Sequence, residues 1–488
     1  SRDGTVALAQ ARGARVLECA WSDDFSAPRN RALAEARGPW VLVLDADEEL
    51  DPGSVGELRG LLQGGGWDAA EVAIANRLRP GEAVSGVSHR YCRLFRKLPG
   101  VAFEGRVHEQ VLPSLLRAEA RVARSNIRIL HAGYGLDPDA LRAKQERNLS
   151  LLQRELAERP GDRFLLFHLG VTLFALGRPA DAAAPLRACL KGCSLPPEAL
   201  CMAHVKLAQS ALAEGDRTRA REHLDEAEAM RPRSALITYL RAGIAYAEGR
   251  HAEAAELLER LLGSGGGMSC EEVLDEGAVR LDYGNCLYHL GRFAEAGREY
   301  LRAAELQPGA ALVRYNLGNA LYQEGRYGEA LLAYDRALAL RPDLTCAREN
   351  AWQCTLRLAQ QLEEQGRDAE LAALDARGAP RELRQIVACA RVRQGRAQET
   401  LPLLRELHRE DPGDASAAFL LAVGLREARC LEESLELFGR LAPGQEANPH
   451  FLSQHALALL EAGRPEEAER VFAQALALDP GLAAPRAA

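Results

Sequence analysis

The chain has 488 residues, a formal net charge of -8 and 27% charged residues. A single core stops growing at roughly 250–300 residues, so this length predicts at least two domains or a repeat array. The acidic balance disfavours a nucleic-acid-binding protein, whose binding surface is usually basic, and the lack of any apolar run of about 18 residues argues against a membrane-spanning helix.

The cysteines and the first residues indicate the compartment and the extent of the chain. The 11 cysteines are scattered, and none forms a C-x-x-C pair. Scattered, unpaired cysteines usually act as small buried hydrophobic residues in a reducing compartment, so we expect a cytoplasmic protein. The N-terminus has neither an initiator Met nor an apolar signal segment, and the chain is therefore expected to be a fragment or a processed form.

Strands and helices are predicted to alternate along the first part of the chain. The predicted elements are strands at Ala14–Glu18, Trp40–Leu44 and Val72–Ile74 and helices at Pro28–Ala36 and Pro52–Leu62. Ser26 is a candidate N-cap for the first of these helices. The continuous apolar run Trp40–Leu44 is typical of a buried parallel strand. The alternation predicts an α/β layer.

An acidic run, Asp45-Ala46-Asp47, directly follows the strand Trp40–Leu44. Open α/β sheets bind ligands at this end of their strands. If extended geometry persists, Asp45 and Asp47 point the same way and can hold Mg²⁺ or Mn²⁺ beside a diphosphate. Acidic residues at a helix entry give the same pattern, and that alternative stays open. An EF-hand does not fit, because its sixth position lacks Gly.

Six segments within residues 1–135 occur in order and resemble motifs of the family 2 glycosyltransferases. They are Ser1–Thr5, Phe25–Asn30, Leu44–Glu48, Arg93–Arg96, Gly105–Glu109 and His131–Tyr134. The resemblance implies a GT-A fold with a Rossmann-like sheet and inverting transfer from a nucleotide sugar. It extends to bacterial enzymes that join this domain to tetratricopeptide repeats, and to the sublancin-type S-glycosyltransferases.

The resemblance also implies roles for individual residues. The metal ligands would be Asp45, Asp47 and His131, and the catalytic base would be Glu109. The residues in contact with the nucleotide-sugar donor would be Asp3, Arg29, Asn30 and Asp45. Structural roles stay open for His131, Glu109, Arg29 and Asn30. A zincin site is excluded, because Leu112 stands where H-E-x-x-H needs its second His. The family's first strand and its base-gripping acid do not appear in these 488 residues, so we expect a truncated GT-A domain.

From about Asp162 the sequence repeats with a period of 34 residues. The row from Leu317-Gly318 to Pro342 recurs from Tyr283-Gly284 to Pro308 and again from His455-Ala456 to Pro480. Small residues let two antiparallel helices approach, Gly ends the first helix, and Pro ends the second. This pattern matches the tetratricopeptide signature. Eight clear units and a degenerate ninth around Trp352 predict an all-α superhelix.

Two neighbouring repeats carry a polar and aromatic face on their first helices. Its members are Asn285, Tyr288, His289, Tyr315, Asn319, Tyr322 and Gln323. Spacings of three and four residues place each set on one helix face. Asn can bond a peptide backbone through both its donor and its acceptor, so the face suits an extended peptide. A solvated helix face is the alternative interpretation.

The sequence therefore predicts three segments. Residues 1–135 form a partial glycosyltransferase domain, residues 136–161 a helical linker, and residues 162–482 the repeats. The predicted function is a metal-dependent inverting transfer, with Mn²⁺ or Mg²⁺, from a nucleotide sugar to a polypeptide or glycan acceptor recruited by protein-binding repeats. The alternative is an interaction scaffold with an inactive transferase remnant. A P-loop enzyme is disfavoured, because G-x-x-x-x-G-K-[ST] is absent.

Overall fold

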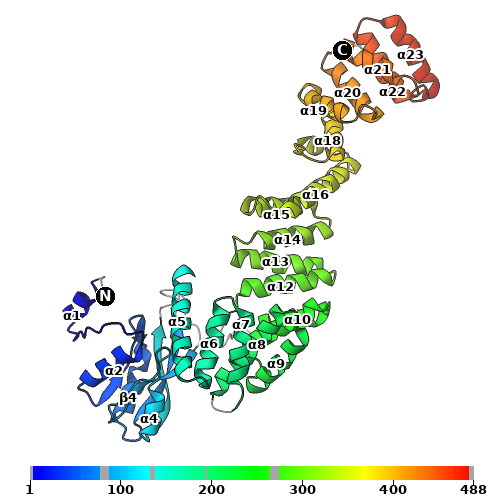
Figure 1. The fold of residues 1–488 in the computed structure, drawn as a ribbon. Coiled ribbons are helices and arrows are strands. Elements are labelled where there is room, and N and C mark those ends of the chain that lie inside the picture. Colours follow the sequence, from blue (N-terminus) through cyan, green and yellow to red (C-terminus); the bar gives the residue numbers. More distant parts are fainter. Residues whose placement is uncertain (1–3, 77–86, 132–137, 193–194, 264–273, 483–488) are drawn as a thin grey trace. The chain divides into compact units, whose positions relative to one another are not determined.

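The computed structural model describes residues 4–76, 87–131, 138–192, 195–263 and 274–482. The chain forms two compact units, residues 1–286 and 287–488. The first unit contains an α/β layer and the first helical hairpins, and the second contains the remaining hairpins (Figure 1). The predicted boundaries at residues 135 and 161 stay predictions.

A mixed β-sheet organises the N-terminal part of the first unit. The strands are β1 (Trp40–Leu42), β2 (Glu48–Leu50), β3 (Ala69–Asn76), β4 (Val87–Arg96) and β5 (Val122–His131). In the described residues they lie in the order β1-β4-β3-β5-β2. The pair β3 and β5 is parallel, and the other neighbours are antiparallel. The predicted α/β class is confirmed, with a sheet of mixed direction.

Helices pack on both faces of this sheet, with α2 (Ser26–Glu35) and α4 (Leu112–Arg117) in one core and α3 (Val55–Gln63), which follows the 3-10 turn η1 (Pro52–Ser54), in the other. The first unit also contains α1 (Thr5–Ala11), which has no buried residue, and α5 (Pro138–Glu158), which packs against the first helical hairpin. One core cluster joins Leu33 of α2 and Leu115 of α4 to Phe95. A second cluster joins the leucines of α3 to Leu94 and Ile127. Leu94 and Phe95 are neighbours in β4, and their side chains therefore point to opposite faces of the sheet and pack in two separate cores.

Three local predictions for this layer are wrong. Residues 12–25 contain no strand, because the side chains of Ala14–Glu18 stay largely exposed and the backbone finds no ladder partner. The strand after α2 ends at Leu42, pairs antiparallel with β4 and is half-buried at the edge of the sheet. Ser26 is the first helical residue, and Asp24 caps α2 instead by accepting from the backbone N–H of Ser26 at 2.7 Å.

The rest of the described chain is a series of helical hairpins. The helices are α6 (Arg163–Ala175), α7 (Pro179–Cys189), α8 (Pro197–Ala213), α9 (Arg217–Met230), α10 (Ala235–Ala247), α11 (His251–Gly263), α12 (Glu276–His289), α13 (Phe293–Leu306), α14 (Ala311–Gln323), α15 (Tyr327–Leu340), α16 (Thr345–Glu364), α17 (Asp368–Ala373), α18 (Arg381–Arg393), α19 (Ala397–Glu410), α20 (Ala415–Glu427), α21 (Leu431–Leu441), α22 (Pro449–Glu461) and α23 (Pro465–Leu478). Within the described ranges they follow one another as nine helix–turn–helix pairs, which confirms the repeat prediction.

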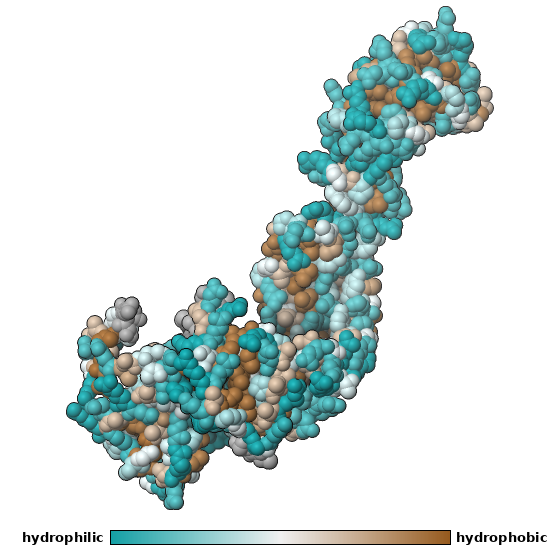
Figure 2. All heavy atoms as spheres, viewed as in Figure 1, coloured by the Kyte–Doolittle hydropathy of each residue, from teal (hydrophilic) through white to brown (hydrophobic). Residues whose placement is uncertain are grey.

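The repeating small residues explain the hairpins. Gly291, Gly325 and Gly463 end first helices with φ near +74°, a conformation that Gly adopts without steric cost. Inside α14, a Cβ at Gly318 would lie 2.6 Å from the ring of Tyr334, so the fully buried ring of α15 needs glycine opposite it. In Figure 2, hydrophilic residues cover most of the visible surface, and hydrophobic residues show mainly in the seams between neighbouring helices.

The degenerate repeat forms a lopsided hairpin. Helix α16 has 20 residues, whereas α17 has six. The guanidinium of Arg391 in α18 donates to the carbonyl oxygens of Ala372 and Leu374, both at 2.9 Å, and so satisfies carbonyls that the end of α17 leaves open. No helix in the described residues is both long and apolar enough to cross a membrane.

Candidate functional site

The acidic run forms a turn between the two edge strands. Strand β1 ends at Leu42 at one edge of the sheet, and β2 begins at Glu48 at the other, so the connecting residues must cross the ends of the inner strands. The backbone N–H of Glu48 donates to the carbonyl of Asp45 at 3.0 Å. The extended geometry expected for Asp45 and Asp47 is therefore wrong, and the two carboxylates have different partners.

Asp45 is the centre of a chain of alternating charges. Arg29 of α2 donates through Nη2 to Asp45 Oδ1 at 2.6 Å and through Nε to Glu109 Oε1 at 2.5 Å. Arg93 of β4 donates to Asp45 Oδ2 at 3.0 Å and lies 3.4 Å from Glu48 Oε1. Glu48 in turn accepts from the backbone N–H of Asp45 at 2.8 Å. The predicted residues Arg29, Asp45 and Glu109 are thus brought together.

Arg93 reaches this chain from a β-bulge. Ala70 of β3 pairs with Leu94, but the next residue, Glu71, pairs with Cys92, so Arg93 is an extra residue without an opposite partner on β3. A bulge redirects a side chain out of the regular alternation. The sequence pattern alone assigns no role to Arg93, although Arg93 opens one of the motifs that resemble the glycosyltransferase family.

Electrostatics favour the ionised forms of Asp45 and Arg29. Burial acts to raise the pKa of Asp45, but the charges of Arg93 and Arg29 outweigh burial, and the net pKa is lowered. Burial acts to lower the pKa of Arg29, while Glu109 and Asp45 raise it, and the net pKa is raised. The side chain of Glu109 is 12% exposed and that of Arg93 15% exposed. Partly buried pairs of this kind are screened little by salt.

Asp47 lies on the other side of the turn, against His131. The Oδ2 atom of Asp47 is 3.2 Å from Nε2 of His131, because the pairing of β2 with β5 places Glu48 opposite His131. A carboxylate and an imidazole together suit Mn²⁺ better than Mg²⁺, which prefers oxygen ligands. Among the described residues, no group of three or more His, Cys, Asp or Glu side chains is placed to hold a metal ion.

Of the three predicted metal ligands, only Asp47 and His131 lie close enough together to bind one cation. Asp45 is neutralised by two guanidinium groups, which makes it a poor third ligand in this arrangement. Its predicted role in metal binding stays a prediction. Asp3 and Ala132–Tyr134, the last part of one motif, lie outside the described residues.

Asn30 holds the start of the loop that carries Glu109. Its Nδ2 donates to the carbonyl of Phe103 at 2.9 Å, and its Oδ1 accepts from the N–H of Phe103 at 2.7 Å. Glu104 and Gln110 then pair through two backbone hydrogen bonds of 2.9 Å, which closes the loop around Glu109. Asn30 thus has a structural use, and its assignment to the donor contacts stays a prediction.

A cleft in the second unit gathers most of the predicted groove residues. It has a volume of about 260 Å³, and its lining residues are Tyr288, Tyr315, Asn319, Tyr322, Gln323, Tyr334, Asn350 and Gln353. Five of the seven predicted residues are among them, whereas Asn285 and His289 are not. None of the lining side chains carries a full charge, so the cleft offers tyrosine rings and amides.

Hydrogen bonds fix the orientation of the amides in this cleft. Asn319 Oδ1 accepts from the hydroxyl of Tyr334 at 2.8 Å and from Asn350 Nδ2 at 2.9 Å. Asn350 Nδ2 also lies 3.2 Å from the hydroxyl of Tyr315. The oxygen of Asn319 is therefore occupied, which leaves its amide nitrogen as the donor for a ligand. Asn350 is absent from the predicted groove residues because it belongs to the degenerate repeat, which lacks the small-residue pattern.

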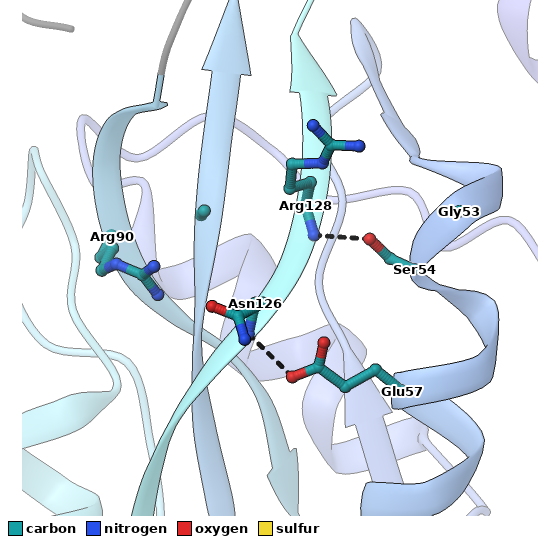
Figure 3. Close-up of a pocket in the computed structure, with 7 residues that line it drawn as sticks. Gly53, Ser54, Glu57, Arg90, Asn126 and Arg128 are labelled. Carbon is teal, nitrogen blue, oxygen red and sulfur yellow. Dashed lines mark hydrogen bonds between the residues drawn. The ribbon is translucent and has the colours of Figure 1, made fainter. Parts of the chain in front are cut away.

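A second hollow lies between α3 and the sheet. Figure 3 shows Arg90, Asn126 and Arg128 on the strands facing Ser54 and Glu57 on the helix side. The N–H of Arg128 donates to Ser54 Oγ at 2.9 Å, and the N–H of Asn126 donates to Glu57 at 2.8 Å. None of the predicted site residues lines this hollow. Its backbone hydrogen bonds attach α3 to the edge of β5, which is a structural use.

The α/β layer with its charged turn, followed by helical hairpins, defines an α/β domain joined to a helical repeat array. Residues 1–101 match the family described as Glycosyl transferase family 2. Models of the tetratricopeptide repeat match residues 164–188, 205–269, 284–325, 311–344 and 449–474. The chain therefore carries a family 2 glycosyltransferase domain followed by multiple tetratricopeptide repeats, and the resemblance noted in the sequence is confirmed.

Individual relatives share parts of the chain. A TPR repeat-containing protein of Synechococcus elongatus is 40% identical over 184 residues, which are 36% of this chain and 44% of the relative. The SPbeta prophage-derived glycosyltransferase SunS of Bacillus subtilis is 25% identical over 165 residues, which are 33% of this chain and 38% of SunS. The chain thus spans less than half the length of each of these relatives.

Among solved structures, YrrB, described as a TPR protein with an unusual peptide-binding site, is 17% identical. It has a TM-score of 0.33, and the match covers 41% of this chain and 96% of YrrB.

Proposed function

We propose that the protein is a metal-dependent inverting glycosyltransferase that moves a sugar from a nucleotide-sugar donor to an acceptor recruited by its repeats. The observation that carries the proposal is the charged chain Glu109–Arg29–Asp45–Arg93 at the strand ends of a family 2 domain. It supplies, in one place, a carboxylate for proton transfer and two cations near the position expected for a diphosphate.

Glu109 is the candidate base. In an inverting transfer, the acceptor atom bonds to the anomeric carbon while the bond from that carbon to the diphosphate oxygen breaks. The acceptor proton passes to the carboxylate of Glu109, and the nucleoside diphosphate leaves with the electron pair. The bond from Arg29 to one oxygen of Glu109 orients the carboxylate.

In this proposal the leaving group lies beside the guanidinium groups of Arg29 and Arg93. Both are paired with carboxylates of the site, and they would donate to the departing diphosphate as negative charge builds on it. Asp47 and His131 would hold a divalent cation, which supplies further neutralisation of that charge when bound.

The repeats are proposed to recruit the acceptor. The uncharged cleft around Asn319 and Tyr334 presents an oriented amide donor and tyrosine rings, which suit an extended polypeptide. The proposed location is the cytoplasm. An interaction scaffold with an inactive transferase domain remains the second candidate, and the same cleft would serve it.

Release of nucleoside diphosphate tests the proposal. The protein is incubated with UDP-glucose, UDP-N-acetylglucosamine and GDP-mannose, each with Mn²⁺ and each with EDTA. We expect release from at least one donor that EDTA stops and that Asp47→Asn abolishes. Glu49→Gln, at an exposed acid in the same run, is the control and should keep the activity. Release that persists in Asp47→Asn would reject the metal assignment, and no release from any donor would favour the scaffold.

A further inference from the structure

We infer that helices α5 and α6, where the repeat array begins, position the candidate base Glu109 and so form part of the catalytic site. The inference rests on the proposed role of Glu109. It concerns the loop Gly105–Glu109, which belongs to the transferase layer by sequence but is held from outside by residues 151–168.

The loop has a strained backbone that needs external support. Glu104 and Gln110 pair at its base, and within it Gly105 has φ +100° and His108 has φ +57°. A left-handed conformation is uncommon for a residue other than glycine, and it persists where surrounding contacts impose it. Glu109 follows His108 directly, so the contacts that impose the conformation of His108 also set the direction of Glu109.

The first external contact is a buried carboxylate. Glu155 of α5, whose side chain is 3% exposed, accepts from the backbone N–H of Arg106 through Oε2 at 2.8 Å. The side chain of Arg106 bonds Glu158, one turn further along α5, at 2.7 Å. A hydrogen bond from a backbone N–H to an ionised, buried acceptor is among the stronger ones in proteins. Helix α5 therefore fixes the backbone at the start of the loop.

The second contact is apolar and falls in the middle of the loop. Val107 is 4% exposed and packs with Leu151 and Leu152 of α5 and with Leu165 of α6. Two helices thus enclose one side chain of the loop. Leu165 belongs to the first helix of the first repeat, so the array itself contributes to this contact.

The third contact is a ring stack next to Glu109. The imidazole rings of His108 and His168 lie 3.9 Å apart between centroids, with their planes within 16° of each other. His168 in α6 is itself flanked by the rings of Phe164 and Phe167, at 4.3 and 5.1 Å. The plane on which His108 rests is therefore fixed by the repeat helix.

These contacts act together on a group that catalysis would need in one position. A misplacement of about 1 Å can lower a rate by about 100-fold. Glu109 is bound by Arg29 from the transferase side, while its loop is held by α5 and α6 from the repeat side. Both His168 and Glu155 are positioning residues in this account, since they act on the base through the loop.

The test compares His168→Ala with His168→Phe, which keeps an aromatic ring for the stack. Glu155→Ala is compared with Glu155→Gln, which keeps an oxygen acceptor for the N–H of Arg106. The matched control is His204→Ala, which removes a histidine in ring contact with His223 in the second hairpin of the same unit, 5.3 Å between centroids. Two readouts are used: hydrogen exchange of the peptide covering residues 103–111, and kcat and KM for the donor found active with Mn²⁺.

We expect both alanine variants at Glu155 and His168 to raise exchange in that peptide and to lower kcat by about 10- to 100-fold, with KM for the donor within about two-fold. Phe and Gln should restore most of both values, and His204→Ala should change neither. Unchanged exchange and kcat in His168→Ala would overturn the inference, as would an equal loss in His204→Ala. If the parent turns over no donor, the proposed function fails, and the exchange measurement still decides whether α5 and α6 hold the loop.

Discussion

Replacing Gly318 with alanine should destabilise the second unit, although alanine is the better helix former. Gly318 lies within α14, where the change from glycine to alanine alone is worth about 1 kcal/mol in favour of the helix. The new Cβ would lie 2.6, 2.7 and 2.9 Å from three ring atoms of Tyr334. A Cβ does not approach non-bonded ring carbons this closely, so the ring or the helix must move.

The ring has little room to move. Tyr334 is 1% exposed, and its hydroxyl donates to Asn319 at 2.8 Å. Overpacking of a dense core costs about 1–3 kcal/mol, and loss of the hydroxyl hydrogen bond adds about 1 kcal/mol. After the gain in helix propensity is subtracted, the net destabilisation should be about 1–3 kcal/mol.

Thermal unfolding followed by circular dichroism at 222 nm measures this effect. The control is Gly439→Ala, in α21 of the same unit, where a Cβ would meet no atom within 4 Å. We expect the Gly318→Ala transition to fall by several degrees and the Gly439→Ala transition to stay level or rise. If Gly318→Ala melts no lower than Gly439→Ala, the close approach of α14 to α15 cannot be what selects glycine there.

Three further outcomes follow from described contacts. Burial, with the charge of Lys144, lowers the pKa of His108 from about 6.5 to about 4. The free energy of unfolding should therefore be full above about pH 6.5 and fall by up to about 3 kcal/mol toward pH 4. Urea midpoints should show a smaller acid loss in His108→Phe, and equal losses would contradict the assignment. Arg391→Ala should speed hydrogen exchange in α17, because the carbonyl of Leu374 loses the Arg391 donor and that of Ala372 keeps only the longer bond from Arg396. Unchanged exchange would refute that role. Tyr334→Phe should cost about 1 kcal/mol by removing the bond to Asn319, and an unchanged melting temperature would show that bond to be weak.

The repeats were predictable because each unit uses only local information. Gly325 ends a helix by its own backbone preference, and Gly318 and Tyr334 meet within one hairpin. The 34-residue period therefore carries both the helix ends and the close contacts. It also located most of the cleft, since Tyr315 and Asn319 lie on one face of one helix.

The candidate site was predicted by residue type but not by geometry. The side chains of Asp45 and Asp47 have different partners because the chain turns between β1 and β2, which lie at opposite edges of the sheet. No local sequence pattern contains this topology. Arg93 joins Asp45 only because a residue is inserted in the pairing of β4 with β3. Glu155 lies 46 residues beyond Glu109 in the sequence, so its hold on the loop could not be read from spacing.

The short helix α17 gives the second unit a weak joint. Of its six residues only Leu371 and Ala372 are buried, while the long helix before it contributes Asn350 and Gln353 to the cleft. In an array held by contacts between neighbours, local opening is favoured where an element contributes few buried residues. A ligand in the cleft would therefore add its binding free energy to the helices that line it, which are α12, α14, α15 and α16. The helices from α18 onward do not line the cleft, and they would receive that free energy only through the core that α16, α17 and α18 share.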